Sequence, residues 1–173
     1  MKKFFTTAVA VSALLFTVAC KAQEDKSKRA SPPAQATQKT GDLTITIDYS
    51  QPSVKGRTIG SDLEPMDGQV WRTGANDATT FEVNKDVKVE GQALPKGKYG
   101  LFTLKNGSDW TIIFNKTWKQ WGAFSYKEAD DALRVTVKES KADPFAEKMT
   151  FTISDAGVVT LVWGEHKVQF TVK

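Results

Sequence analysis

Apolar and polar side chains alternate at every second position along much of the chain from residue 41 onward. Between Leu43 and Ser50, apolar side chains occupy the odd positions and polar ones the even positions. Residues 133–138, 149–153 and 167–172 show the same period. This period places one face of a strand on a core and the other in water. The pattern therefore predicts an all-β domain over residues 41–173, with no long helix.

Turn residues separate the alternating runs. Asn106 and Gly107 stand between two apolar runs, a dipeptide typical of tight hairpins. Residues 155–157 and 164–165 are expected to be turns that divide the last three strands into a meander. Residues 127–133 are the one place where a single helical turn is expected. Strands spaced in this way predict an antiparallel β-sandwich, jelly-roll-like or immunoglobulin-like.

The first 20 residues have the pattern of an export signal that ends in a lipid attachment site. Lys2 and Lys3 precede an apolar run that continues to Ala19, and the single cysteine of the chain, Cys20, follows directly. The end of this run resembles a bacterial lipobox, although Thr17 stands where leucine is usual. The resemblance implies a signal peptide over residues 1–19, cleavage before Cys20 and acylation of that cysteine. The alternative is an ordinary secretory signal with an incidental cysteine.

Residues 20–40 are expected to form a lipid-anchored, flexible tether. They are polar and contain no aliphatic side chain larger than alanine beyond Cys20, so they offer little surface for a core. The chain would then be exported and anchored in the cell envelope, in the periplasm or on the outer surface, with the membrane as its partner. Residues 41–173 contain 17 basic and 18 acidic side chains. This near-neutral net charge argues against nucleic-acid binding, which depends on a basic surface.

Several blocks of the domain resemble a bacterial family of exported or membrane-anchored proteins known as DUF2911, a domain of unknown function. These blocks are ITIDYSQPSVKGRTI (45–59), VWRTGANDATTF (70–81), LPKGKYGLFTL (94–104), WTIIFNKTWKQWGAFSY (110–126) and LRVTVK (133–138). The resemblance implies a β-rich domain over residues 41–173. It implies no particular activity.

A small set of polar and aromatic side chains is expected to contact a ligand. Arg72 offers a planar fork of donors, Asn76 offers a donor and an acceptor, and Trp121 offers a ring that can stack on a sugar. The remaining candidates, on neighbouring segments, are Gln120, Lys55 and Arg57. The alternative for each is structural, with the tryptophan in the core and the polar residues in turns or ion pairs.

The sequence contains few residues of the types that catalysis usually needs, and this favours a binding role over an enzymatic one. His166 is the only histidine, and zinc would lack ligands. No cofactor or metal is expected. The hypothesis is a non-catalytic domain that binds a glycan or another polar envelope component. The alternatives are a protein-interaction module of the envelope and a hydrolase that uses a pair of carboxylates.

Overall fold

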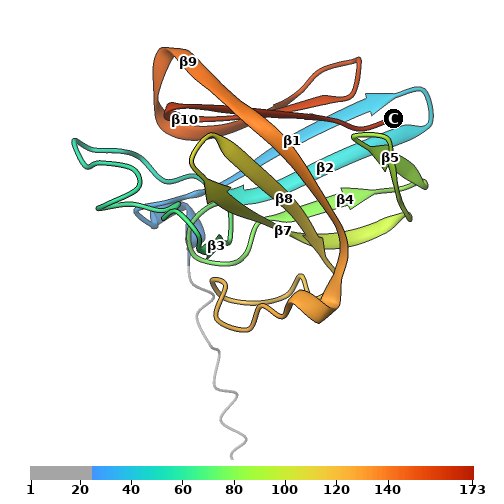
Figure 1. Cartoon of the computed structure of the whole chain (residues 1–173), viewed down its shortest axis with the longest axis horizontal. Helices are drawn as coiled ribbons and strands as arrows, with labels where there is room; N and C mark the ends of the chain where they lie inside the picture. The colour runs from blue at the N-terminus through green and yellow to red at the C-terminus, as the bar shows by residue number, and fades with distance from the viewer. Residues whose placement is uncertain (1–24) are drawn as a thin grey trace, which may run out of the picture.

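The computed structural model describes residues 25–173 as an antiparallel β structure (Figure 1). No α-helix is present in this part of the chain. The elements in chain order are η1 (Lys26–Lys28), β1 (Pro33–Thr40), β2 (Leu43–Ser50), β3 (Val70–Trp71), β4 (Thr80–Val83), β5 (Val87–Val89), β6 (Gln92–Leu94), β7 (Gly97–Asn106), β8 (Asp109–Asn115), η2 (Glu128–Asp130), β9 (Asp131–Ile153) and β10 (Val158–Thr171). The all-β prediction is confirmed, and so is the hairpin at Asn106 and Gly107.

One layer of the structure contains the strands in the order β1-β2-β4-β7-β8 and the first part of β9, with β3 paired to β7. The alternation seen in the sequence sets its faces. Ile45 and Ile47 of β2 are buried, whereas their neighbours Thr44 and Thr46 are only partly covered. Each strand of this layer therefore turns one row of apolar side chains toward the core.

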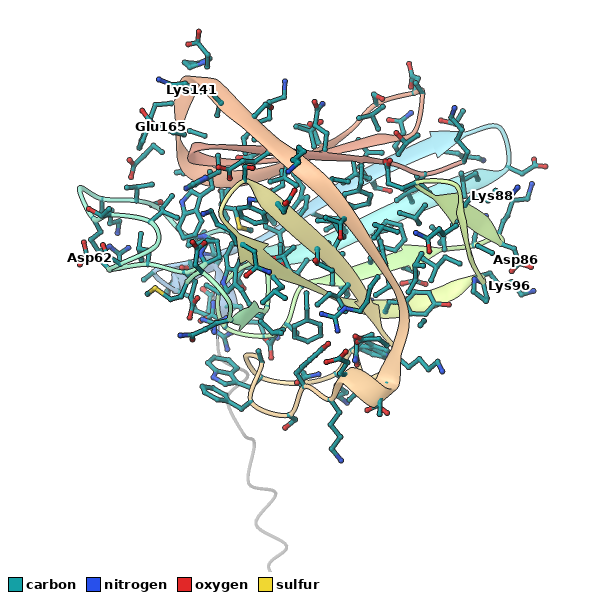
Figure 2. The ribbon with its side chains drawn as sticks, viewed as in Figure 1. Asp62, Asp86, Lys88, Lys96, Lys141 and Glu165 are labelled. Carbon is teal, nitrogen blue, oxygen red and sulfur yellow. The ribbon has the colours of Figure 1, made fainter. Side chains whose placement is uncertain are left out.

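The long strand β9 connects this layer to a second one. Its residues 131–138 pair with β8, and its residues 139–153 pair with β10. The β5-β6 hairpin extends the second layer, because Val89 bridges to Val172 at the end of the chain. On the outer side of this layer, Lys141 and Glu165 lie together at the bend that β9 and β10 share (Figure 2), 3.7 Å apart.

Aromatic side chains from both layers form the core. The ring of Phe114 on β8 lies 4.9 Å from that of Phe81 on β4 and 6.0 Å from that of Phe170 on β10. All three are at most 3% exposed. Burial of a phenylalanine contributes about 1.5–3 kcal/mol, so this contact between the layers is a main source of stability. Tyr49 and Phe151 make a similar contact nearer the loops, with ring centroids 5.1 Å apart.

Two expectations about boundaries are wrong. The expected tether over residues 20–40 extends too far, because Pro33–Thr40 forms β1 and pairs with the whole of β2. The expected turn at 164–165 lies inside β10, where Gly164 has a φ of +60° and the pairing with β9 shifts register. A bulge of this kind uses the same residues as a turn but keeps the strand continuous.

The signal peptide over 1–19 and Cys20 lie outside the described residues.

Strand β1 provides a direct test of the revised boundary. Ala36 points inward and is 9% exposed, whereas Lys39 on the same strand is exposed. We expect Ala36→Asp to lower the free energy of unfolding by about 2–4 kcal/mol, because it buries a carboxylate without a partner. Urea unfolding of residues 25–173 measures this change. Lys39→Asp is the matched control, and equal effects of the two substitutions would show that residues 33–40 do not pack on the domain.

Candidate functional site

Three loops and the segment that leads into β1 meet at one end of the sandwich. The loop 72–79 is joined to the β8–β9 loop by hydrogen bonds from Ala78 N to Gln120 O (2.9 Å) and from Gly122 N to Asn76 O (3.0 Å). The backbone N–H of Gln51, just after β2, donates to Pro32 O at 2.8 Å. These backbone hydrogen bonds hold the loops at this end of the sandwich, called the rim below, in one arrangement, as a binding site on a rigid sheet scaffold requires.

The segment WRTGAN forms a compact turn, and its sequence explains why. Trp71 is 2% exposed and donates its indole N–H to Gly74 O at 3.1 Å. A Cβ on Gly74 would lie 2.8 Å from Thr79 Oγ1, so only glycine fits this approach. Thr73 and Asn76 adopt left-handed conformations, with φ of +52° and +58°. The turn directs Arg72 toward a cavity at the rim.

The Arg72 cavity has a volume of about 270 Å³. Its walls come from the segment before β1, the loop between β2 and β3, the WRTGAN turn and β10. The lining residues are Ser31, Pro52, Arg57, Asp62, Leu63, Glu64, Trp71, Arg72, Gly74, Ala75 and Trp163. Asp62 lies on the long loop that projects from the body of the molecule (Figure 2). The cavity thus combines two guanidinium groups, two carboxylates and two indole rings.

Two N–H donors in this cavity are buried without an acceptor. Neither Arg72 Nε nor Trp163 Nε1 has a hydrogen-bond partner among the residues that the structure describes. Trp163 is 4% exposed and stacks on Trp71, with ring centroids 5.5 Å apart. A buried donor without an acceptor costs about 1–3 kcal/mol. Both side chains line the same cavity, so a ligand whose acceptor atoms reach these donors would recover this free energy.

Burial also affects the charge of Arg72. Desolvation lowers the pKa of its guanidinium, and the negative charge of Glu64 acts in the opposite direction. Arginine remains protonated at neutral pH in spite of such a shift. The cavity therefore holds a positive charge that is only partly solvated, which strengthens its attraction for an anionic group.

The predicted contact residues divide between this cavity and its surroundings. Arg72 and Arg57 both line it. Arg57 is fixed by its own loop, since its Nε donates to Val54 O (3.1 Å) and its Nη2 to Ser53 O (2.8 Å). Lys55 is exposed on that loop, and its backbone N–H donates to Glu147 Oε1 at 2.8 Å. Lys55 does not line the cavity.

The other three predicted residues belong to the neighbouring turns. Asn76 donates to Ser31 O at 3.0 Å and thereby fastens the segment before β1 to the WRTGAN turn. Gln120 donates to Thr117 O at 2.7 Å within its own loop. Trp121 is 55% exposed, and the guanidinium carbon of Arg29 lies 5.7 Å from its ring centroid. The structure thus gives Asn76 and Gln120 clear structural contacts, while Trp121 faces solvent.

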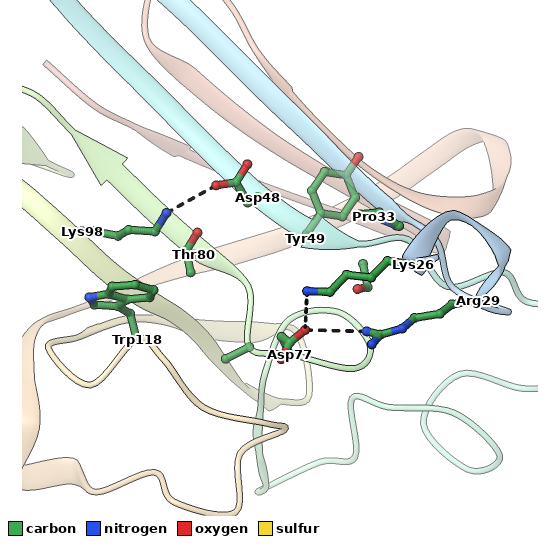
Figure 3. A pocket seen from close by; sticks show the side chains of 11 residues that line it. Lys26, Arg29, Pro33, Asp48, Tyr49, Asp77, Thr80, Lys98 and Trp118 are labelled. Carbon is green, nitrogen blue, oxygen red and sulfur yellow. Dashed lines mark hydrogen bonds and ion pairs between the residues drawn. The ribbon is translucent and has the colours of Figure 1, made fainter. Parts of the chain in front are cut away.

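A second hollow, the Trp118 groove, is lined in part by Asp77 and Ala78 of the loop 72–79 (Figure 3). Its volume is about 210 Å³, and Trp118 forms one wall. The ammonium group of Lys98 lies 5.1 Å from the Trp118 ring centroid and 3.5 Å from Asp48 Oδ2. Asp77, on the opposite side, pairs with Lys26 and Arg29 at 3.9 and 3.7 Å. The charged groups of this groove thus already have partners, unlike the two donors of the Arg72 cavity.

Sequence reasoning missed Trp163 as a site residue. In the structure its ring is buried on β10. Only the absence of an acceptor for its indole N–H distinguishes it from an ordinary core tryptophan. No pattern along the chain contains that information.

Two further properties describe residues 25–173. They contain no group of three or more His, Cys, Asp or Glu side chains placed to hold a metal ion. They also contain no helix that is long and apolar enough to cross a membrane. The fold and the rim together define a class: a small β-sandwich with a polar cavity at its loop end.

The family model for DUF2911, described as a protein of unknown function, matches residues 31–172. The chain belongs to this family, as its sequence blocks predicted. The match begins before β1, in agreement with the revised start of the domain. No curated protein and no solved structure matches the chain.

The role of Asn76 is tested by comparing two substitutions. Asn76→Ala removes the bond to Ser31 O and places alanine in a left-handed conformation, whereas Asn76→Gly removes only the bond. We expect the alanine variant to lose about 2 kcal/mol of stability and the glycine variant about half of that. Thermal and urea unfolding measure both changes. A glycine variant as unstable as the alanine variant would contradict this explanation.

Proposed function

We propose that this chain is an envelope-anchored, non-catalytic binding protein whose ligand enters the Arg72 cavity. The observation that carries the proposal is that two side chains lining this cavity, Arg72 and Trp163, each have a buried N–H donor, Nε and Nε1, without an acceptor. A native protein seldom leaves two such groups unpaired around one cavity, because nearly all buried polar atoms have partners. A ligand that brings acceptor atoms would satisfy both donors.

The charges around the cavity indicate which ligand fits. Arg72 and Arg57 favour a carboxylate or another anionic group. Asp62 and Glu64 line the same cavity and favour hydroxyl or ammonium donors elsewhere on the ligand. The volume of about 270 Å³ lies just below the range typical of small-molecule sites. An acidic sugar or an amino-acid-sized fragment of the cell wall combines these features.

Ligand binding is tested by thermal-shift measurements with acidic sugars and cell-wall fragments, with neutral sugars beside them. At about 100 times its dissociation constant, a ligand should stabilise the protein by roughly 2.7 kcal/mol. We expect Trp163→Phe and Arg72→Lys to abolish this shift, since each removes one of the two donors.

Arg134→Lys is the matched control for these substitutions. Arg134 lies on β9 and pairs with Glu128 at 2.8 Å, and it does not line the cavity. This variant should keep the full ligand-induced shift. The proposal fails if no acidic ligand shifts the melting temperature, or if Trp163→Phe binds the ligand as well as the native protein does.

The anchor is proposed to be an acyl-modified Cys20. The support comes from the sequence, in which Cys20 directly follows a charged start and an apolar run. We expect the full chain, expressed in a bacterium, to enter the detergent phase on phase separation and to carry a diacylglyceryl group on Cys20 by mass spectrometry. Cys20→Ala should abolish the modification. An unmodified wild-type chain in the aqueous phase would refute the anchor.

A further inference from the structure

Exposed aromatic side chains gather on the β8–β9 loop. Among the described residues, four large hydrophobic side chains are exposed: Trp118 (38%), Trp121 (55%), Phe124 (86%) and Phe145 (54%). The first three lie within seven residues of one another on this loop, at the lower end of the molecule in Figure 1. A cluster of this kind in water marks an interaction surface rather than a random scatter of exposed residues.

The charge of this loop is entirely basic over its aromatic part. Residues 116–127 contain three lysines and no carboxylate. The acidic residues that follow this loop in the chain already have partners, because Glu128 pairs with Arg134 at 2.8 Å and Asp130 accepts a hydrogen bond from Thr117 at 3.0 Å. Aromatic rings that alternate with lysines are the combination that favours the headgroup region of an anionic bilayer.

The N-terminal part of the domain lies directly beside the loop. The guanidinium group of Arg29 stands over the Trp121 ring, and Asp77, which pairs with Arg29, forms a β-bridge with Trp121. Asp25, the first described residue, is separated from Cys20 by only four residues. A fully extended chain spans at most about 18 Å over these five steps. An acyl group on Cys20 would therefore keep this end of the domain close to the membrane surface.

We propose that the β8–β9 loop docks on an anionic lipid bilayer, with Trp121 and Phe124 in the headgroup region and the three lysines against the lipid phosphates. The inference rests on the proposed acylation of Cys20 and is independent of the ligand of the Arg72 cavity. Docking orients the domain, since the bend shared by β9 and β10 lies at the other end of the molecule and faces away from the lipid (Figure 2).

Quenching of tryptophan fluorescence by lipids with brominated acyl chains tests this docking. The full chain is purified from bacterial membranes and reconstituted into vesicles of equal parts phosphatidylglycerol and phosphatidylethanolamine. Trp71, Trp110 and Trp163 are at most 4% exposed, so the quenched emission should come from the loop. We expect quenching in the native chain and its loss when Trp118→Phe and Trp121→Phe are combined.

Phe124→Asp and Phe145→Asp form a matched pair for the same vesicles. Both positions expose a phenylalanine, but Phe145 shares a cavity with Glu165 and His166 and lies away from the loop. We expect Phe124→Asp to remove the quenching while the acyl group keeps the chain in the vesicle fraction, and Phe145→Asp to leave the quenching unchanged. Circular dichroism confirms that each variant is folded.

Three results would overturn the docking proposal. The first is a native chain that is bound to vesicles but is not quenched. The second is quenching that survives Phe124→Asp, and the third is quenching that is equally strong when phosphatidylcholine replaces phosphatidylglycerol. Failure of ligand binding to the Arg72 cavity would leave all three measurements unaffected, so the two proposals are tested separately.

Discussion

Strand β9 is the constraint on which the rest of the structure depends. Its first part pairs with β8 and its second part with β10, so one continuous backbone belongs to both layers. The hydrogen bonds on either side of the crossing fix where Phe170 of β10 meets Phe114 of β8, 6.0 Å apart. A shift of one residue in either pairing would turn the apolar face of a strand into water. The core and the alignment of the loops at the rim therefore follow from the register of this one strand.

The positions of the loops at the rim also depend on how β9 and β10 pair. Gly164 sits in the bulge of β10, and a Cβ there would lie 2.6 Å from Ile59, so the long loop after β2 packs directly across the strand. Next to the bulge, Trp163 turns inward and stacks on Trp71. The loop 51–69, the WRTGAN turn and β10 thus meet around the indole of Trp163. Together with the segment before β1, these three segments, which are distant in the chain, form the walls of the cavity.

The sequence predicted the features that depend on local patterns and missed those that depend on contacts between distant segments. The period of two residues identified β2, both ends of β9 and the end of β10, because a half-buried strand shows its faces directly, and the Asn106-Gly107 turn identified the hairpin of β7 and β8. It missed β1, since this strand is held largely by backbone pairing with β2 and buries only the small side chain of Ala36. Arg72 was found from its chemistry, whereas the significance of Trp163 depends on acceptors that are absent around it in three dimensions.

The two stacked tryptophans give the strongest argument that the cavity serves more than packing. Their rings lie 5.5 Å apart and share the same surroundings, yet Trp71 donates to Gly74 O at 3.1 Å while Trp163 donates to no described residue. A phenylalanine at position 163 would keep an aromatic ring there without a buried donor, and removing an unsatisfied polar group is often neutral or stabilising. The native residue therefore keeps a buried donor without an acceptor among the described residues. Unpaired polar groups at a polar cavity are typical of a binding site, where they remain unsatisfied until a ligand arrives.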